Sequence, residues 1–413
     1  MRFRLPLACA SEAVTVPNRF KRWKEGVGDG KVKEGATDAK HLWQRLIEAF
    51  AATSEEARRP RVFVGFLHGL QADQSLVTAL LDDAVEHPTL GAYYPCLQVG
   101  VPLQAQDVVR LTRSVSIGKA AASMYRFLVG GRVTAHVAPA ALRGLLLAIA
   151  AMPSGYMVAV EILQLRFLAD HDSKQASATE PIQTGRDLLE GLPFNQQNDR
   201  DDYKLGMVAR ACLGGDDAAT IAHTVVARFK DAVVKRATHA YYHDDFIAGV
   251  LSMQPLAALD ALCAGTQKAL TQGLSILRNA SLRKPVLATI PDDELIAWCD
   301  QEPVARYSAL APLIMIFAPG SGAPQWTSIS QRFLERSPDP AAILHQFVDR
   351  FADDNGSVGS AATKAVERIA LLDDFDARLA NAAAEEKARL QGWIEDAQRR
   401  ETATDHVRDE RFE

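Results

Sequence analysis

The sequence predicts an all-α protein whose antiparallel helix pairs stack as an α-solenoid or a solenoid-like array. Apolar residues at helical spacing fill most of residues 38–400, and alternating β-branched runs with hairpin turns are nearly absent. The helical segments are short, roughly 10 to 22 residues, and they end at Pro, Gly, Asp or Asn, as helices joined by turns do. Both observations favour many short helices over a few long ones.

Composition narrows the class of protein. The chain has 413 residues, of which 48% are hydrophobic, so it is long enough to bury a large core. It contains no uncharged apolar run of about 18 residues, and its first residues are too interrupted for a secretory signal. Its five cysteines form no C-x-x-C pair, which argues against a disulfide framework and a cysteine zinc site and predicts a cytoplasmic location. A net charge of −5 argues against nucleic-acid binding by the whole protein.

Four parts are expected along the chain. Residues 1–37 are rich in Gly and Lys and read as an irregular segment; helical repeats follow in an N-terminal half, 38–172, and a C-terminal half, 173–375. The polar stretch from His171 to Pro181 is the expected seam between the halves. Residues 376–413 predict a charged C-terminal helix and tail.

The first predicted helix is "DAKHLWQRLIEAFAATSEEARR". Asp38 is its expected N-cap, and Leu42, Leu46, Ile47 and Phe50 share its expected apolar face. Two later stretches resemble strands. We expect "RVFVGFL", near residue 61, to be a helix and "PVLATI", near residue 285, to be an extended linker.

Three prolines mark helix-turn-helix units. Around Pro88, Pro303 and Pro340, an apolar helical segment ends, the Pro is expected to occupy the first turn of the next helix, and a second apolar segment follows. The second helix of each unit would then run antiparallel to the first.

The stretch "D-x-E-P-V-x-R", Asp300 to Arg306, resembles the turn of a HEAT-type helical repeat. The resemblance implies a ladder in which an acidic residue and an Arg of successive repeats pair. Asp300 and Arg306 are the candidates, with Arg306 partly buried against Asp300 or a carboxylate of an adjacent helix pair, because a bare buried Arg would be too costly. The Pro88 unit has Gly91 where Arg306 stands, so the pattern is not continuous.

The stretches "LIAWCDQEP" and "SPDPAAILHQFVDRF" also resemble the helical C-terminal regions that accompany NTPase modules in large bacterial proteins, some of them in phage defence. This resemblance implies the interaction or sensor part of such a system and carries no catalytic residue.

The richest polar cluster is "THAYYHDDF". His239 and His243 are four residues apart, on one face if the segment is helical, and Asp244 and Asp245 follow, so His239, His243 and Asp244 are candidate metal ligands. The favoured interpretation is structural: Asp244 and Asp245 cap the next helix, and His243 is incidental.

An all-α chain with a His-Asp pair also resembles the HD-domain phosphohydrolases, which implies His243 and Asp244 as catalytic residues of a metal-dependent enzyme. Two sets of residues fit that pattern in the sequence: His223, His243, Asp244 and Asp300, or His136, His171, Asp172 and Asp231.

The leading hypothesis is a non-enzymatic repeat protein that binds or scaffolds another protein, with no cofactor. Trp23 and Trp326 are candidate partner contacts because Trp is enriched at binding hot spots. A metal-dependent phosphohydrolase is the enzyme alternative. A DNA-binding repeat protein is the third, and its basic residues would be Arg110, Arg113, Lys119, Arg126 and Arg132.

Overall fold

The structure is a computed structural model that describes residues 32–130, 133–172, 179–195, 201–318, 320, 322–352, 358–373 and 375–409. The side chains of residues 32–36, 172, 358–359 and 404–409 are not described.

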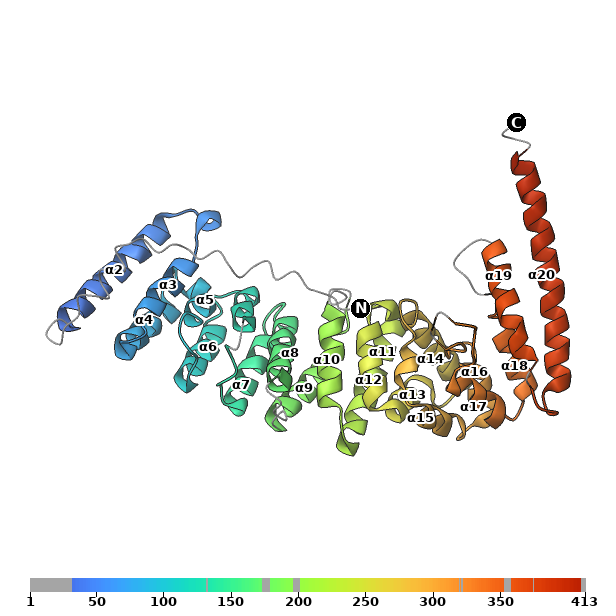
Figure 1. Cartoon of the computed structure of the whole chain (residues 1–413). Helices are drawn as coiled ribbons and strands as arrows, with labels where there is room; N and C mark the ends of the chain where they lie inside the picture. The colour runs from blue at the N-terminus through green and yellow to red at the C-terminus, as the bar shows by residue number, and fades with distance from the viewer. Residues whose placement is uncertain are drawn as a thin grey trace. The chain divides into compact units, whose positions relative to one another are not determined.

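The prediction of an all-α fold is confirmed. Every regular element of the described residues is an α-helix or a 3-10 helix (Figure 1). Strand-like pairing in these residues is limited to an isolated antiparallel bridge between Phe317 and Trp326. None of the described helices is both long enough and apolar enough to cross a membrane.

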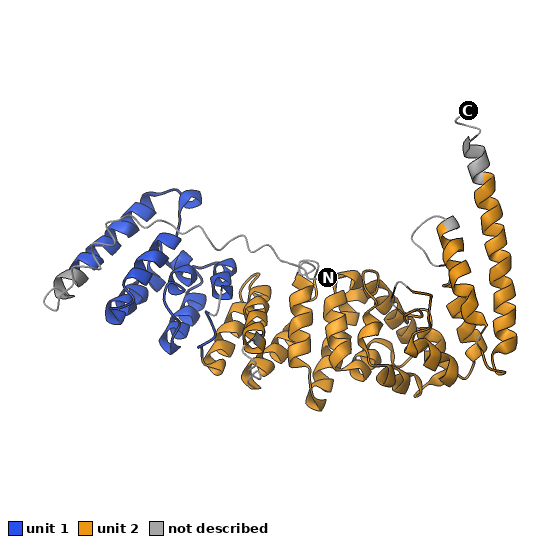
Figure 2. Cartoon of the chain, viewed as in Figure 1, with its two compact units in different colours: residues 1–137 blue, residues 138–413 orange. Residues whose placement is uncertain are grey.

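The chain divides into two compact units, residues 1–137 and residues 138–413 (Figure 2). Most of the seam expected from the sequence, residues 173–178, lies outside the described residues. The expected irregular segment is partly helical, because the first described helix already begins at Val32.

Unit 1 consists of short helices. They are α2 (Val32–Ala52), η1 (Glu55–Ala57), α3 (Arg61–Gly69), α4 (Gln74–Glu86), η2 (Gly91–Tyr93), α5 (Tyr94–Gln98), α6 (Ala105–Ile117) and η3 (Ala122–Val129). The stretch "RVFVGFL" forms α3, as expected.

The buried face of α2 agrees with the expected one in part, because Ile47 and Phe50 are buried as predicted. Trp43 fills its centre, with its ring 5.1 Å from that of Phe63 and 5.6 Å from that of Phe66, whereas Leu42 is exposed. Asp38 is an interior residue of α2, so the prediction of an N-cap there is wrong. The large Trp43 ring takes the buried position that was expected for its neighbour Leu42.

Unit 2 holds the remaining elements. They are α7 (Pro139–Ala150), α8 (Tyr156–Asp172), α9 (Thr179–Gly191), α10 (Asp202–Cys212), η5 (Asp216–Ala218), α11 (Ala219–Val234), η6 (Ala240–Tyr242), α12 (Asp244–Met253), α13 (Pro255–Cys263), α14 (Gln267–Ala280), η7 (Val286–Thr289), α15 (Asp292–Cys299), α16 (Pro303–Leu310), α17 (Ser328–Arg336), α18 (Pro340–Val348), α19 (Val358–Arg368), η8 (Ile369–Leu372) and α20 (Ala380–Asp409).

Packing within unit 2 joins helices that are close in the sequence. The helix α7 packs on α8 and α9, α10 packs on α12, α11 on α13, α13 on α15, and α15 on α17. At the end of the unit, α18 and α19 pack on α20. Each helix therefore contacts the next one or the next but one along the chain (Figure 1).

Proline begins several of these helices. Pro303 and Pro340 stand in the first turn of α16 and α18, as expected, and Pro139 and Pro255 do the same in α7 and α13. The missing N–H of Pro costs nothing there, because the first N–H groups of a helix have no intrahelical acceptor.

Two local expectations are wrong. Pro88 begins no helix: a turn and η2 follow it, and α5 begins only at Tyr94. The stretch "PVLATI" is not fully extended, because Val286–Thr289 form the 3-10 helix η7, in which Val286 and Leu287 are buried.

Candidate functional site

The most densely connected polar site of unit 2 lies where α10 crosses α12. Two glycines allow the crossing: a Cβ on Gly206 would lie 2.5 Å from the Asp245 carbonyl oxygen, and one on Gly249 would lie 2.7 Å from that of Gly206. Because only Gly permits so close an approach of two backbones, this pair brings the start of α10 against the start of α12.

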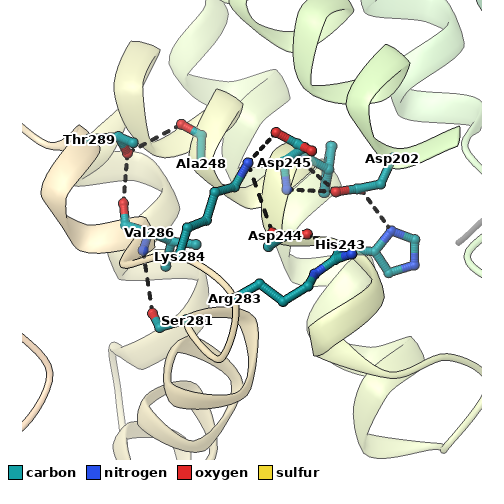
Figure 3. Close-up of polar contacts among 11 residues, drawn as sticks. Asp202, His243, Asp244, Asp245, Ala248, Ser281, Arg283, Lys284, Val286 and Thr289 are labelled. Atoms are coloured by element: carbon teal, nitrogen blue, oxygen red, sulfur yellow. Dashed lines mark hydrogen bonds and ion pairs between the residues drawn. The ribbon is translucent and has the colours of Figure 1, made fainter. Parts of the chain in front are cut away.

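Asp202, the first residue of α10, caps α12 from outside the helix. Its Oδ2 accepts hydrogen bonds from the backbone N–H of Asp245 at 2.6 Å and of Phe246 at 3.2 Å (Figure 3). A carboxylate here also interacts favourably with the positive end of the helix dipole. The expectation that Asp244 and Asp245 cap this helix is therefore wrong; the cap comes from a residue 43 positions before Asp245.

His243 connects this cap to the interior. Its Nδ1 lies 3.3 Å from Oδ1 of Asp202, and its Nε2 lies 3.0 Å from Oγ1 of Thr238. The ring meets the edges or faces of Phe194, Phe229 and Phe246 at centroid distances of 5.9, 5.4 and 6.4 Å. His243 is thus a core residue with two polar partners, and the interpretation of it as incidental is wrong.

Burial controls the electrostatics of Asp202. Desolvation raises the pKa of its carboxyl group above 3.8, while the hydrogen bonds and charge of His243 and the two backbone N–H groups oppose that rise. Keeping the carboxylate ionised therefore requires its hydrogen-bond partners.

Thr238, His243 and Asp202 stand in the order hydroxyl, imidazole, carboxylate, which is the order of a nucleophile, a general base and its orienting group. Their exposed fractions are 1%, 1% and 3%. No substrate carbonyl can reach the Thr238 hydroxyl in this conformation, so the arrangement supports packing and helix capping rather than acyl transfer.

Three carboxylates meet at the outer side of this site. Asp202, Asp244 and Asp245 each offer an oxygen within 4.8 Å of the others, the one group of three metal-capable residues found among the described part of the chain. The chain provides its own cations: Arg283 pairs with Asp244, and Lys284 pairs with Asp245 and lies 3.9 Å from Asp244 (Figure 3). These cations balance the charges of Asp244 and Asp245 from within the chain.

The candidate metal ligands His239 and His243 do not converge. His239 is exposed and stacks on Tyr241, whereas His243 is buried. The segment between them is the 3-10 helix η6, so a spacing of four does not place them on one face.

The residues of the HD-type sets have separate environments. His223 is exposed on α11, Asp244 pairs with Arg283, and Asp300 pairs with Arg336. Of the second set, His136 belongs to unit 1, His171 and Asp231 belong to unit 2, and the side chain of Asp172 is not described.

Arg306 and Asp300 have different partners. The buried Arg306 guanidinium donates to the Trp298 carbonyl oxygen at 2.8 Å and to Glu302 Oε1 at 2.7 Å, and it lies 4.0 Å from Asp260 Oδ1. Asp300 instead accepts from Tyr307 at 2.8 Å and from Arg336 at 2.6 Å.

Trp326 lies just before α17 in an aromatic cluster and is partly exposed. Trp23, the other candidate partner contact, lies outside the described residues.

Two of the five basic residues that the sequence offered in unit 1, Arg110 and Arg113, pair with acids. Arg110 is buried and pairs with Asp82 at 2.6 Å and Asp107 at 2.5 Å, and Arg113 pairs with Glu86. Lys119 donates to the Glu86 carbonyl oxygen, Arg126 is exposed, and Arg132 lies outside the described residues. This pairing reduces the charge that Arg110 and Arg113 offer to phosphates.

No protein-family model, curated protein or solved structure matches the chain.

Sequence reasoning missed Asp202, Thr238, Arg283 and Lys284. The sequence gives little indication of the role of Asp202. An Asp at the start of a helix, with a Gly four residues later, looks like any ordinary helix start. Its role depends on a second helix about 40 residues away, which no local pattern specifies.

Proposed function

We propose that the chain is a non-enzymatic HEAT-like repeat protein that binds or scaffolds another protein. The observation that carries the repeat architecture is a recurring sequence separation between polar partners. Asp260 accepts from Trp298 at a separation of 38, Asp300 from Arg336 at 36, and Ser308 from Gln346 at 38.

The same separation recurs earlier and later in unit 2. Asp202 and His243 are 41 residues apart, the Ala248 carbonyl oxygen and Thr289 are 41 apart, and His345 and Glu386 are 41 apart. Helical arrays of the HEAT class repeat every ~40–47 residues. Side chains that bridge neighbouring repeats at such a spacing support a stacked array.

The helix contacts support the same arrangement. In a stack of helix pairs each repeat contacts only its neighbours. Most helices of unit 2 pack on the next or the next but one along the chain, and α11 also contacts α14. Arg306 belongs to this pattern, because it lies between Trp298 of α15 and Asp260 of α13. A ladder of the HEAT type would run through Asp260, Arg306, Asp300 and Arg336.

A binding role follows from what such stacks offer. Stacked helix pairs present long continuous surfaces made from many repeats, which suit extended protein partners. The buried Thr238–His243–Asp202 arrangement and the internally neutralised carboxylates give little support to hydrolysis. The resemblance to helical regions beside NTPase modules favours the interaction or sensor part of a larger bacterial assembly.

A cytoplasmic location is part of the proposal. Cys96, Cys212, Cys263 and Cys299 are free thiols, and each is buried. Free cysteines without disulfides are typical of reducing compartments.

The test is reconstitution from purified components. The tagged full chain is isolated from the cells that encode it, each protein enriched with it is purified separately, and 1:1 binding is measured by isothermal titration calorimetry. We expect one protein to bind in the absence of any other cell component. If no purified protein binds, and the chain hydrolyses phosphoesters in the presence of Mn²⁺ or Mg²⁺, the proposal is wrong and the phosphohydrolase replaces it.

A further inference from the structure

A pocket of about 740 Å³ opens between α17, η8 and the segment before α20, all within unit 2. Its floor is apolar and aromatic and is formed by Trp326, Leu334, Leu371, Phe375 and Leu379. The volume lies within the range of ~300–1,000 Å³ that is usual for ligand sites, so the pocket has room for a large side chain and its neighbours.

Trp326 is held firmly in this floor. Its ring centroid lies 5.9 Å from that of Phe347, 5.7 Å from that of Phe351 and 6.0 Å from that of Phe375. Its indole N–H donates to the Leu371 carbonyl oxygen at 3.4 Å. An aromatic side chain that is already fixed loses little conformational entropy when a ligand stacks on it.

The rim of the pocket is acidic. Glu335, Glu367 and Asp376 line it together with one cation, Arg378, so three negative charges and one positive charge leave −2. The Arg378 guanidinium is already engaged, because it donates to the carbonyl oxygens of Leu334 at 2.7 Å and Glu335 at 3.0 Å. A cation from outside would therefore meet a lining of net negative charge that also contains an aromatic residue.

We propose that this pocket binds an arginine side chain, flanked by apolar residues, on an exposed segment of a protein partner. The inference rests on the proposed protein-binding function and names the chemistry of the partner. A guanidinium can stack on Trp326 and donate to the rim carboxylates, and its aliphatic stem and apolar neighbours can cover the half-buried Leu371 and Phe375.

The chain itself uses this geometry twice. Arg306 Cζ lies 4.0 Å from the Trp298 ring centroid while the guanidinium donates to Glu302. Arg368 Cζ lies 4.2 Å from the Phe317 ring centroid while it donates to the Phe351 carbonyl oxygen at 2.7 Å. The pocket combines the partly exposed Trp326 ring with carboxylates, and among the described residues no arginine guanidinium lies over that ring. A lysine fits less well, because its compact ammonium ion cannot stack flat or donate in a fork.

The experiment measures fluorescence polarisation with the full chain and a fluorescein-labelled heptapeptide that has Arg at its centre and Leu on both sides. The matched probe has citrulline, the uncharged analogue, in place of Arg. We expect the Arg peptide to bind, the citrulline peptide to bind about tenfold more weakly or worse, and affinity for the Arg peptide to fall as salt rises. Equal binding of the two peptides, or binding of neither, overturns the inference.

Variants locate the binding in the pocket. Glu335→Gln combined with Glu367→Gln should weaken the Arg peptide about tenfold, and Ala370→Trp, which adds bulk at the pocket wall, should block it. Glu395→Gln, an exposed carboxylate on α20 outside the pocket, should change nothing. Circular dichroism checks that each variant is folded. If the double variant Glu335→Gln, Glu367→Gln does not fold, the binding of the Arg peptide to Ala370→Trp alone tests the inference.

Two results separate the inference from the proposed function. A reconstituted partner that binds the wild type and the Ala370→Trp variant equally overturns the inference and leaves the binding function standing. A dimer of the chain that dissociates on Ala370→Trp shows that a second copy occupies the pocket, and this also overturns the inference. A partner that binds the wild type and loses its affinity in both pocket variants supports it.

Discussion

The guanidinium of Arg306 lies over Trp298 with its Cζ 4.0 Å from the ring centroid, and one of its nitrogens donates to the carbonyl oxygen of the same residue at 2.8 Å. Both contacts are buried, and they fix the α15–α16 turn. An arginine in an apolar stretch is thus satisfied by one aromatic residue, the carbonyl oxygen of Trp298, the Gln301 side chain and two nearby carboxylates.

The first prediction compares two arginines. Arg306→Ala should lower the free energy of unfolding by about 3 kcal/mol, because it removes charge-assisted hydrogen bonds and a desolvated cation–π contact. Arg332→Ala should cost less than about 1 kcal/mol, because Arg332 pairs with Asp293, whose side chain is 90% exposed. Urea unfolding followed by circular dichroism measures both. Equal midpoints would remove the strongest single support for an Arg306 junction between repeats.

The second prediction concerns the core imidazole. His243→Ala should cost about 2–4 kcal/mol, since it leaves a cavity among three phenylalanines and strands the Asp202 carboxylate. His239→Ala, an exposed neighbour, should stay within about 0.5 kcal/mol of the wild type. Thermal unfolding of the two variants distinguishes a structural histidine from an incidental one, and a wild-type melting temperature for His243→Ala would contradict the assignment.

The third prediction concerns the cap of α12. Asp202→Ala leaves the N–H groups of Asp245 and Phe246 without their acceptor and should cost about 2 kcal/mol. Asp202→Asn keeps an acceptor oxygen and removes a charge whose burial is unfavourable, so it should cost less than the Ala variant at pH 7. The ranking is the test: an Asn variant as unstable as the Ala variant would show that the charge, rather than the hydrogen bonds, holds the cap.

Much of the fold was predictable because single residues and their near neighbours in the sequence determine where helices begin. Pro303 and Pro340 begin helices in the positions that their sequence context predicts, since the preference of Pro for the first turn depends on one residue. The prediction for Pro88 was wrong, because Pro88 to Leu90 form a turn before the 3-10 helix η2 begins at Gly91.

The site was much less predictable than the fold. The cap on α12 needs Asp202, which lies two helices earlier, and the approach of those helices needs Gly206 opposite Gly249. No sequence pattern near Asp202, Gly206 or Gly249 marks these roles. Each of the three residues acts on the backbone of another helix, which only the folded chain brings close. The spacing of the two histidines led to a wrong prediction for a local reason. A spacing of four places two residues on one face only in an α-helix, whereas the 3-10 helix η6 separates the exposed His239 from the buried His243.

The fourth prediction concerns the thiols. Burial raises the pKa of Cys212, Cys263 and Cys299 to about 12 and that of Cys96 to about 11. In a Cys9→Ser background, which removes the remaining cysteine, the native chain should react negligibly with a disulfide reagent at pH 8, because the thiolate is the reactive form. All four thiols should react in denaturant. Fast reaction of one of them in the native chain would show local opening at that helix.

The last prediction concerns acid pH. The hydrogen bond from Arg336 is the main cause that holds the pKa of Asp300 below 3.8, with the Tyr307 hydroxyl adding to it. The folded chain therefore protonates Asp300 at a lower pH than the unfolded chain. The stabilisation is fully present above about 3.8 and is lost as the pH falls through the folded-state pKa. Asp300→Asn should thus flatten the dependence of the free energy of unfolding on pH below about 4, whereas Asp83→Asn, on the exposed side of α4, should keep the wild-type slope. Chemical unfolding at a series of pH values measures both slopes. Identical slopes for the wild type and Asp300→Asn would mean that Asp300 and Arg336 do not pair in solution, and the link between the α15–α16 pair and α17 would then have to rest on apolar packing alone.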